Sequence, residues 1–266
     1  MSPSPIEVIE LYKDYHTKQS TIAAVRGISF RVNESECLGL LGPNGAGKTT
    51  TMNCLTGFLW PSSGIIRILG HSVAETPREA RRNLGVCSQE DTLDTDFTVL
   101  NQLVQYGTYF GLRRREARTR AIALLKRMGL EDRANWLVEA LSGGMRRRLQ
   151  VARALINQPR VLILDEPSTG LDPEVRRDLW KIIGEYKQSG AAILLSTHYM
   201  DEAQRLCDRV ALMSKGAILD CDTPEMLIKR HCGVGSLEEE VRPGVMWRRP
   251  ANLEDVYLKV TGGEQL

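Results

Sequence analysis

The sequence predicts an α/β fold: a mostly parallel sheet with flanking helices, an antiparallel β subdomain and a helical insertion. Short, almost continuously apolar runs alternate with amphipathic segments of helical length, as in VLILDEP at 161–167, which precedes the helical pattern at 173–190. Such runs are typical of strands buried on both faces of a parallel sheet. The runs at 6–15, 21–32 and 63–70 partly alternate and are separated by turn residues, which favours an antiparallel layer. Between Gln89 and Leu141 the apolar period becomes helical.

The chain is expected to form one large domain with an appendage. Its length is 266 residues, and α/β domains of about 200 to 250 residues are common. We assign 1–235 to the main domain, with the helical insertion at about 90–157, and 236–266 to a small C-terminal extension. In the extension, Leu253, Val256, Tyr257 and Val260 follow the spacing i, i+3, i+4, i+7, which predicts a short amphipathic helix that packs against something.

Composition excludes some classes of protein. Hydrophobic residues make up 42% of the chain and the net charge is only +2, which is typical of a globular protein and gives no support for nucleic-acid binding. No apolar run reaches the roughly 20 residues of a membrane span, and the N-terminus lacks the pattern of a secretory signal. We therefore expect the chain to remain in the cytosol, with its six cysteines as reduced, buried thiols.

A glycine-rich turn between an apolar run and a helical pattern predicts a phosphate site. Its sequence fits G-x-x-x-x-G-K-[ST] and is followed by Thr50: Gly42, Pro43, Asn44, Gly45, Ala46, Gly47, Lys48 and Thr49. The glycines let backbone N–H groups curl around phosphate oxygens, and the following helix adds the positive end of its dipole. Lys48 can then reach the β- and γ-phosphates, and the Thr49 hydroxyl can bind Mg²⁺. The turn alone does not distinguish a hydrolase from a kinase or a switch.

A pair of carboxylates resolves part of that ambiguity. Asp165 ends the apolar run VLILD, so it should lie at the edge of the sheet where it can hold Mg²⁺ directly or through water. Glu166 points to the other side of the pleat and could polarise a water molecule for attack on the γ-phosphate.

The stretch LSGGM at 141–145 predicts a second anion site. Ser142 occupies an N-cap position before an amphipathic helix, and Gly143 and Gly144 permit close backbone approach. One chain does not need two such cradles for a single triphosphate.

Taken together, these motifs resemble those of the ATP-binding cassette (ABC) ATPases, over nearly the whole chain. Gly42–Thr49 resembles the Walker A loop of a P-loop NTPase core, Val161–Asp165 resembles Walker B, and Leu141–Met145 resembles the family signature. The remaining motifs of the family fall in order at Gln89 (Q-loop), at 168–172 with Asp172 (D-loop), at His198 (switch histidine) and at Tyr15 (adenine stacking).

The resemblance implies an ATP-hydrolysing, Mg²⁺-dependent homodimer. Two chains would close head to tail, so that Ser142 and Gly144 of one contact the γ-phosphate held by the other. It also implies that Gln89 binds Mg²⁺ or the attacking water, that Glu166 is the catalytic base and that His198 senses the γ-phosphate.

Two assignments have competing explanations. Tyr12, three residues before Tyr15, could stack on adenine instead, and we favour Tyr15 from its distance to the first strand. The basic runs 113–115 and 146–148 could suggest nucleic acid, but their positions on predicted helices favour solvated faces with local ion pairs.

Two kinds of cassette ATPase fit. One is the energy-coupling subunit of an exporter, bound at the cytoplasmic face of the cell membrane to a polytopic permease on a separate chain; the other is a soluble ATPase acting on ribosomes or DNA. The flanks at 91–111, 152–173 and 251–263 are similar to those of bacterial type-2 ABC exporter ATPases of the nodulation-factor and antibiotic-resistance group, which favours the first. The loop 90–98 would then receive a helix of the permease. The sequence does not identify the exported molecule, the particular permease or the role of the extension.

Overall fold

The computed structural model of the chain describes residues 3–18, 20–233, 236–242 and 245–262. Its largest sheet has six strands in the order β10-β9-β3-β8-β7-β6. Neighbours from β9 to β6 pair in parallel and β10 pairs antiparallel to β9 at the edge. The strands are β3 (Cys37–Leu41), β6 (Leu84–Cys87), β7 (Val161–Asp165), β8 (Ala192–Thr197), β9 (Arg209–Ser214) and β10 (Ala217–Asp222).

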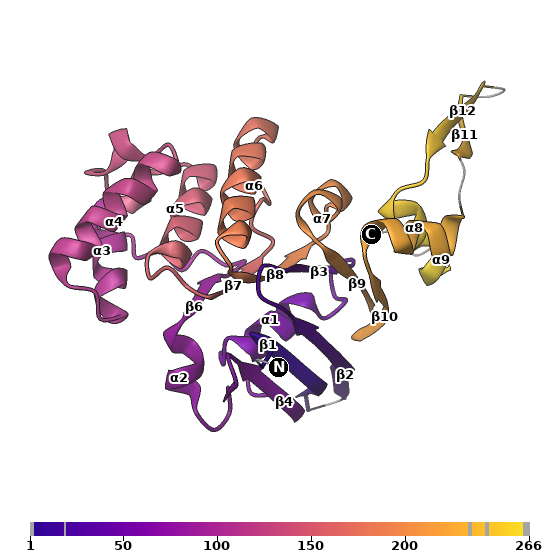
Figure 1. Cartoon of the computed structure of the whole chain (residues 1–266), viewed down its shortest axis with the longest axis horizontal. Helices are drawn as coiled ribbons and strands as arrows, with labels where there is room; N and C mark the ends of the chain where they lie inside the picture. The colour runs from indigo at the N-terminus through magenta and orange to yellow at the C-terminus, as the bar shows by residue number, and fades with distance from the viewer. Residues whose placement is uncertain (1–2, 19, 234–235, 243–244, 263–266) are drawn as a thin grey trace.

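A second sheet packs below the first (Figure 1). It is antiparallel, with the order β2-β1-β4-β5, and its strands are β1 (Ile6–His16), β2 (Thr21–Val32), β4 (Ser63–Ile68) and β5 (His71–Ser72). The space between the two sheets holds α1 (Lys48–Leu55) and one of the two hydrophobic cores. The α/β class and the antiparallel layer predicted from the sequence are therefore confirmed.

The opposite face of the large sheet is covered by helices, which enclose the second core. They are α3 (Val99–Tyr109), α4 (Arg114–Arg127), α5 (Gly143–Leu155), α6 (Pro173–Gln188) and α7 (Met200–Leu206), while α2 (Pro77–Arg82) precedes β6. Figure 1 shows α3, α4 and α5 together at one end of the molecule. Side-chain oxygens of Thr98 and Ser142 accept hydrogen bonds from the first turns of α3 and α5, which explains why these helices begin where they do.

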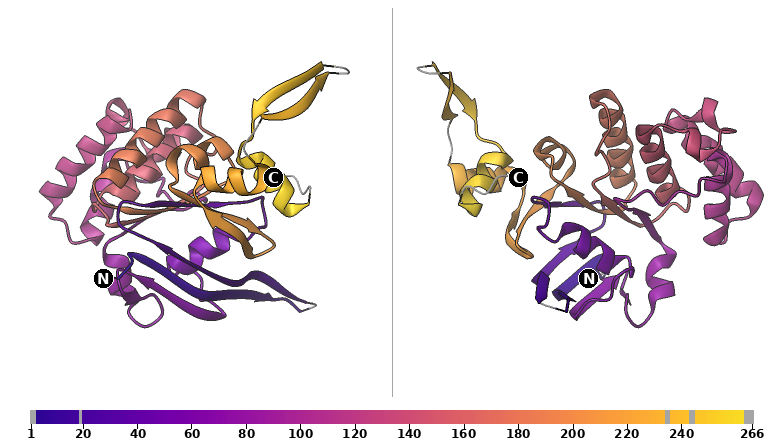
Figure 2. Two further views of the ribbon diagram at one scale, coloured as in Figure 1. Left: turned by 45° about the vertical axis from the view of Figure 1, so that its right-hand side comes forward. Right: turned by 180° about the vertical axis from the view of Figure 1, so that it is seen from behind.

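The C-terminal part consists of α8 (Pro224–Cys232), a hairpin of β11 (Ser236–Arg242) and β12 (Val245–Pro250), and α9 (Leu253–Thr261). The hairpin projects from the body in every view (Figures 1 and 2). Leu253, Val256 and Tyr257 of α9 are completely buried and belong to the core above the large sheet. The predicted amphipathic helix is thus confirmed, and it packs against the main body.

None of the helices in the described residues combines the length and apolar composition that a bilayer span requires. The six cysteines are free thiols, of which Cys37, Cys54, Cys87 and Cys207 are buried.

Candidate functional site

The glycine-rich turn joins the end of β3 to the start of α1. Gly47 has φ of +99° and directly precedes α1, and a Cβ on it would lie 2.5 Å from the Ala24 carbonyl oxygen of β2. Both the conformation and the close approach require glycine here. The turn is therefore tightly fitted to the antiparallel sheet, while Asn44 and Gly45 at its tip are exposed.

The Lys48 ammonium lies inside this turn. Its Nζ donates to the carbonyl oxygens of Gly42 at 2.6 Å and Pro43 at 3.0 Å, and the residue is only 4% exposed. Burial lowers the pKa of Lys48, and the nearby carboxylates of Glu166 and Asp165 oppose that shift. A cation held within a ring of backbone groups is suited to binding an incoming phosphate.

The two carboxylates lie where β7 ends, beside the turn. Glu166 Oε1 is 3.7 Å from Lys48 Nζ, and both side chains are almost fully buried. Asp165 accepts a hydrogen bond from the Ser196 hydroxyl of β8, and burial raises the pKa of its carboxyl group. Glu166 has φ of +48°, an unusual conformation for a residue with a side chain. Its backbone N–H donates to Ser196 Oγ at 3.0 Å.

Two further side chains contact the Glu166 carboxylate. His198 Nδ1 lies 3.2 Å from Oε2, and the Thr169 hydroxyl donates to the same oxygen at 3.3 Å. His198 follows β8 and Thr169 follows β7, so parallel strands bring these residues to one edge of the sheet. Ligands of open α/β sheets bind at this edge.

Three predicted metal ligands also converge. Thr49 Oγ1 donates to Gln89 Oε1 at 3.3 Å. The Thr49 hydroxyl also reaches the Asp165 carboxylate and lowers its pKa, although desolvation dominates the net shift. A hydroxyl, an amide oxygen and a carboxylate are the hard oxygen donors that Mg²⁺ prefers, so the residues present fit this ion. Within the described residues there is no cluster of three or more His, Cys, Asp or Glu side chains that could hold another metal.

The second predicted anion site lies at an exposed helix start. Ser142 Oγ accepts from the Met145 N–H at 3.3 Å, and Ser142 and Gly143 are exposed. Gly143 borders, together with Gln89, Glu166 and Thr169, a hollow on the surface. Asp172 is the residue before α6 and is also exposed.

The two candidate tyrosines differ in their surroundings. The Tyr12 ring covers Gly27, where a Cβ would lie 2.5 Å from Tyr12 Oη. The Tyr15 ring lies 5.3 Å from Lys13 Nζ near the far end of the β1–β2 pair. Tyr12 thus packs on Gly27 within its own sheet but keeps 43% of its surface exposed, and Tyr15 keeps 38%.

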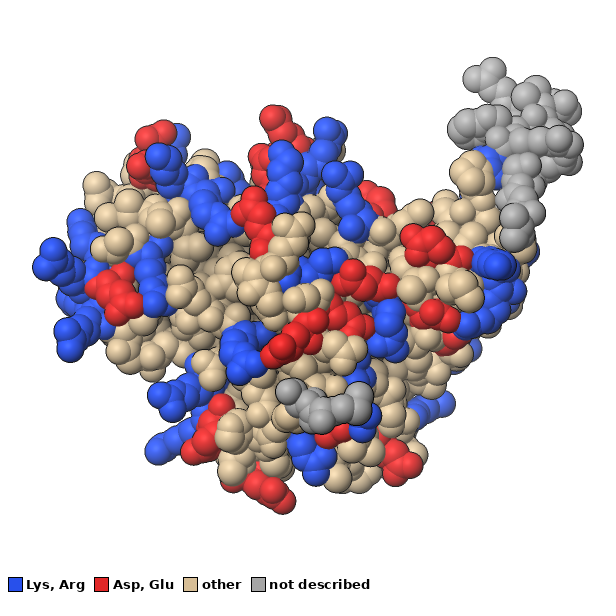
Figure 3. All heavy atoms as spheres, in the orientation of Figure 1, with Lys and Arg blue, Asp and Glu red and all other residues tan. Residues whose placement is uncertain are grey.

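The interpretation of the second basic run was wrong for its central residue. Arg146 does form an ion pair, at 3.7 Å from Asp91, but Arg147 is only 8% exposed and donates to backbone carbonyls beside Glu166. In the first run, residues 113–115 are exposed as expected, and Figure 3 shows basic side chains gathered over α3 and α4. Sequence reasoning missed Arg147, because its partners Ser88 and Glu166 are 59 and 19 residues away and the run itself favours solvated side chains.

Fold and site together define a P-loop nucleotide-binding protein with a buried lysine and two carboxylates beside its glycine-rich turn. A sequence profile of the ABC transporter family matches residues 25–169. The chain belongs to that family and is an ATPase whose nucleotide is ATP.

Particular relatives are similar over the whole length. A protein named Nod factor export ATP-binding protein I, from Burkholderia orbicola (strain AU 1054), is 40% identical, and the alignment covers 99% of each chain. A solved structure described as the ATP binding subunit of an ABC transporter has a TM-score of 0.83 at 28% identity, covering 97% of this chain and all of the other. The structure of cbiO1 from Clostridium perfringens, described as part of the ABC transporter complex cbiONQ, gives 0.73 at 29% identity over 87% of this chain and 92% of the other.

Proposed function

We propose that the chain is the ATP-hydrolysing subunit of an ABC exporter and works as a head-to-tail dimer around two Mg-ATP. The observation that carries this proposal is the division of the site. Lys48, Glu166 and His198 are in contact within one chain, whereas the helix start at Ser142 is exposed and available to a second copy.

In the first half of the site, groups of one chain bind ATP and activate the attacking water. The N–H groups of 42–50 and Lys48 hold the triphosphate, and Tyr15 stacks on adenine. Thr49, Gln89 and Asp165 hold Mg²⁺, which neutralises charge on the phosphates.

Glu166 then accepts a proton from the attacking water. Contacts with the Lys48 ammonium and the His198 ring hold its carboxylate in place. His198 hydrogen-bonds the γ-phosphate or Glu166 and reports hydrolysis.

The second half of the site comes from the partner copy. Ser142, Gly143 and Gly144 at the start of α5 close over the γ-phosphate with the positive end of the helix dipole. Asp172 lies at the interface with the other chain. Binding of ATP therefore favours closure of the dimer, and hydrolysis removes the group that holds the two halves together.

Export is favoured over a soluble role by the named function of the relatives that are 40% identical over the full length. In this proposal, residues 1–235 form the ATPase domain, 236–266 the extension, and the subunit binds the cytoplasmic face of the membrane through a polytopic permease. The loop 90–98 contacts that permease, which selects the cargo.

The role of Glu166 is tested with Glu166→Gln. The variant should bind ATP, hydrolyse it at least 100-fold more slowly, as expected from loss of a general base worth about 10² to 10⁴, and accumulate as an ATP-dependent dimer in size-exclusion chromatography. Hydrolysis at the wild-type rate would show that another group activates the water.

Shared sites are tested by mixing two inactive chains. Lys48→Ala removes the cation of its own site, and Ser142→Arg blocks the partner's site, so each homodimer should be inactive. A mixture contains heterodimers with one intact site, formed by Lys48 of one chain and Ser142 of the other, and should regain activity. A mixture that stays inactive would exclude trans-composed sites.

A further inference from the structure

Arg147 on α5 is a buried cation whose partners are backbone carbonyls. Its Nε donates to Pro167 O at 3.1 Å and its Nη2 to Glu166 O at 2.8 Å and also to Asp165 O. Its Nη1 donates to Ser88 O at 2.5 Å. One guanidinium therefore joins the helix that begins at Ser142, the turn that carries Glu166 and the residue before Gln89.

Burial of the Arg147 guanidinium carries a desolvation cost that its hydrogen bonds must offset. A buried charge needs full hydrogen bonding, and here the planar fork of arginine is satisfied by carbonyl dipoles and by Gln150 Oε1 at 2.7 Å. Three of the four carbonyls belong to the successive residues 165–167, centred on Glu166, whose φ is +48°. Arg147 thus holds a strained backbone in place, and strain at such positions persists only when the surroundings fix it.

The same face of α5 holds the segment after Gln89. Gln150 Nε2 donates to Glu90 O at 3.0 Å, and Arg153 Nη1 donates to Thr92 O at 2.7 Å. Because these side chains and Arg147 are three residues apart, a shift of α5 moves the Glu166 turn and the Gln89 segment together.

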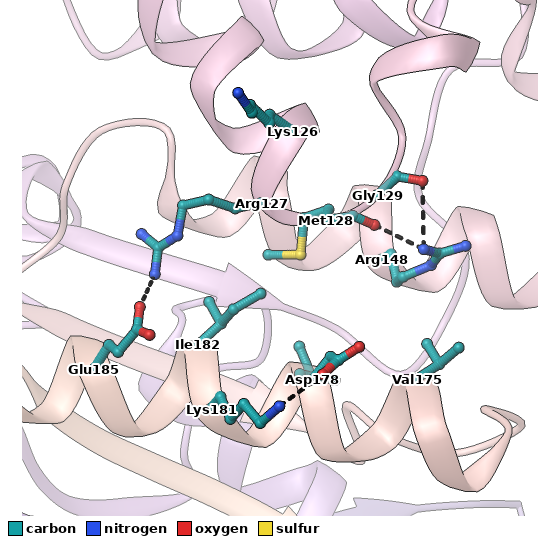
Figure 4. A pocket seen from close by; sticks show the side chains of 11 residues that line it. Lys126, Arg127, Met128, Gly129, Arg148, Val175, Asp178, Lys181, Ile182 and Glu185 are labelled. Carbon is teal, nitrogen blue, oxygen red and sulfur yellow. Dashed lines mark hydrogen bonds and ion pairs between the residues drawn. The ribbon is translucent and has the colours of Figure 1, made fainter.

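Elsewhere the helical insertion is less closely attached to the α6 side. Figure 4 shows a cavity between the end of α4, Arg148 and α6, which the exposed ion pair between Arg127 and Glu185 bridges. Exposed pairs of this kind stabilise by at most about 1 kcal/mol. Arg148 turns away from Glu166 and donates to Met128 O at 2.7 Å.

We propose that Arg147 is a positioning residue that couples the two composite ATP sites. The inference rests on the proposed function, in which Ser142 contacts the ATP held by the partner. Arg147 lies five residues after Ser142, a rise of about 7.5 Å along the helix. Closure of Ser142 on the partner's γ-phosphate moves α5, and Arg147 passes this movement to Glu166 and Gln89 of its own chain. Capture of ATP at one site thereby aligns the hydrolytic groups of the other.

The test uses Arg147→Lys, which keeps the charge but loses the fork, and Arg147→Gln as a second variant. Both should lower kcat about 10-fold or more, since small misplacements of reacting groups can cost up to about 100-fold, with KM changed less than twofold. Arg148→Lys is the matched control, because it also loses carbonyl bonds but none beside Glu166. An unchanged kcat in both Arg147 variants, or equal losses in Arg147→Lys and Arg148→Lys, would overturn the proposal.

The complementing mixture of Lys48→Ala and Ser142→Arg chains separates positioning from general damage. In its single intact site, one chain supplies Lys48 and Glu166 and the other supplies Ser142. Arg147→Lys on the Ser142→Arg chain, which keeps Lys48, should slow hydrolysis about 10-fold. On the Lys48→Ala chain, the same change should leave the rate within twofold of the mixture without it. Equal slowing, or slowing only on the Ser142 side, would contradict the positioning role of Arg147. Because the chain with intact Lys48 carries Ser142→Arg, its α5 cannot close on ATP, and the coupling predicts that the single site works about 10-fold more slowly than a wild-type site. The full wild-type rate per intact site would contradict the coupling. Failure of the mixture without any Arg147 change would instead refute the proposed function.

Discussion

The Tyr257→Ala substitution tests whether α9 is part of the ATPase core. Tyr257 is completely buried, and its hydroxyl donates to the Met213 carbonyl oxygen of β9 at 3.4 Å. Leu253 and Val256, also completely buried, share the same face of the helix. The extension assigned from the sequence thus contributes side chains to the core that supports the large sheet.

The expected loss follows from this burial. Removing a large aromatic side chain from a core costs about 3–5 kcal/mol, through lost transfer free energy and the cavity left behind. A bond of 3.4 Å is long for a hydroxyl donor, so Tyr257→Phe should cost no more than about 0.5–1 kcal/mol. At about 2–4 °C per kcal/mol for a chain of this size, Tyr257→Ala should lower Tm by about 10 °C.

Urea unfolding followed by tryptophan fluorescence and by circular dichroism measures these losses in the full chain. Tyr109→Ala is the control, because that ring is 73% exposed and its removal should change stability by no more than about 0.5 kcal/mol. A loss for Tyr257→Ala below about 1 kcal/mol, or equal to that of the control, would refute the packing argument and leave α9 as a detachable appendage.

Two further predictions concern pH and nucleotide affinity. Glu202 is completely buried, accepts from Trp180 Nε1 at 2.9 Å, and burial raises the pKa of its carboxyl group. Because the folded pKa exceeds the unfolded one, its contribution to stability is present in acid and is lost as pH rises through the folded pKa. Glu202→Gln should therefore have a higher Tm than the wild type at pH 8 and a similar Tm near pH 4; a pH-independent difference would contradict this. For adenine, Tyr15→Ala should weaken ATP binding by about 1–3 kcal/mol in calorimetry while Tyr12→Ala does not, and the reverse result would assign the stacking to Tyr12.

The phosphate turn and the strand-end carboxylate could be predicted because their chemistry is contiguous in sequence. The spacing of Gly42, Gly47 and Lys48 determines the path of the backbone, and an apolar strand that ends in Asp165 places a carboxylate at the sheet edge whatever surrounds it. The layer structure could be predicted for the same reason, since burial on one or two faces determines the local apolar period.

Arg147 could not be predicted from its own neighbourhood. Its partners at Ser88 and Glu166 are 59 and 19 residues away in sequence, so its burial depends on how α5 packs on the sheet. Within a run of three arginines, solvation is the ordinary expectation. The β11–β12 hairpin was also missed, because three consecutive glutamates at 238–240 hide the period of two that identifies a strand.

Two buried cations, Lys48 and Arg147, contact different parts of Glu166. Lys48 and His198 lie next to the carboxylate itself, whereas Arg147 contacts only the backbone around it. A ligand that draws Lys48 to its phosphates changes the electrostatics of the carboxylate without moving its backbone. A movement of α5 changes the position of the backbone without altering the charge beside the carboxylate. Charge and position at Glu166 can therefore respond separately, one to nucleotide in the same chain and the other to the helix that begins at Ser142.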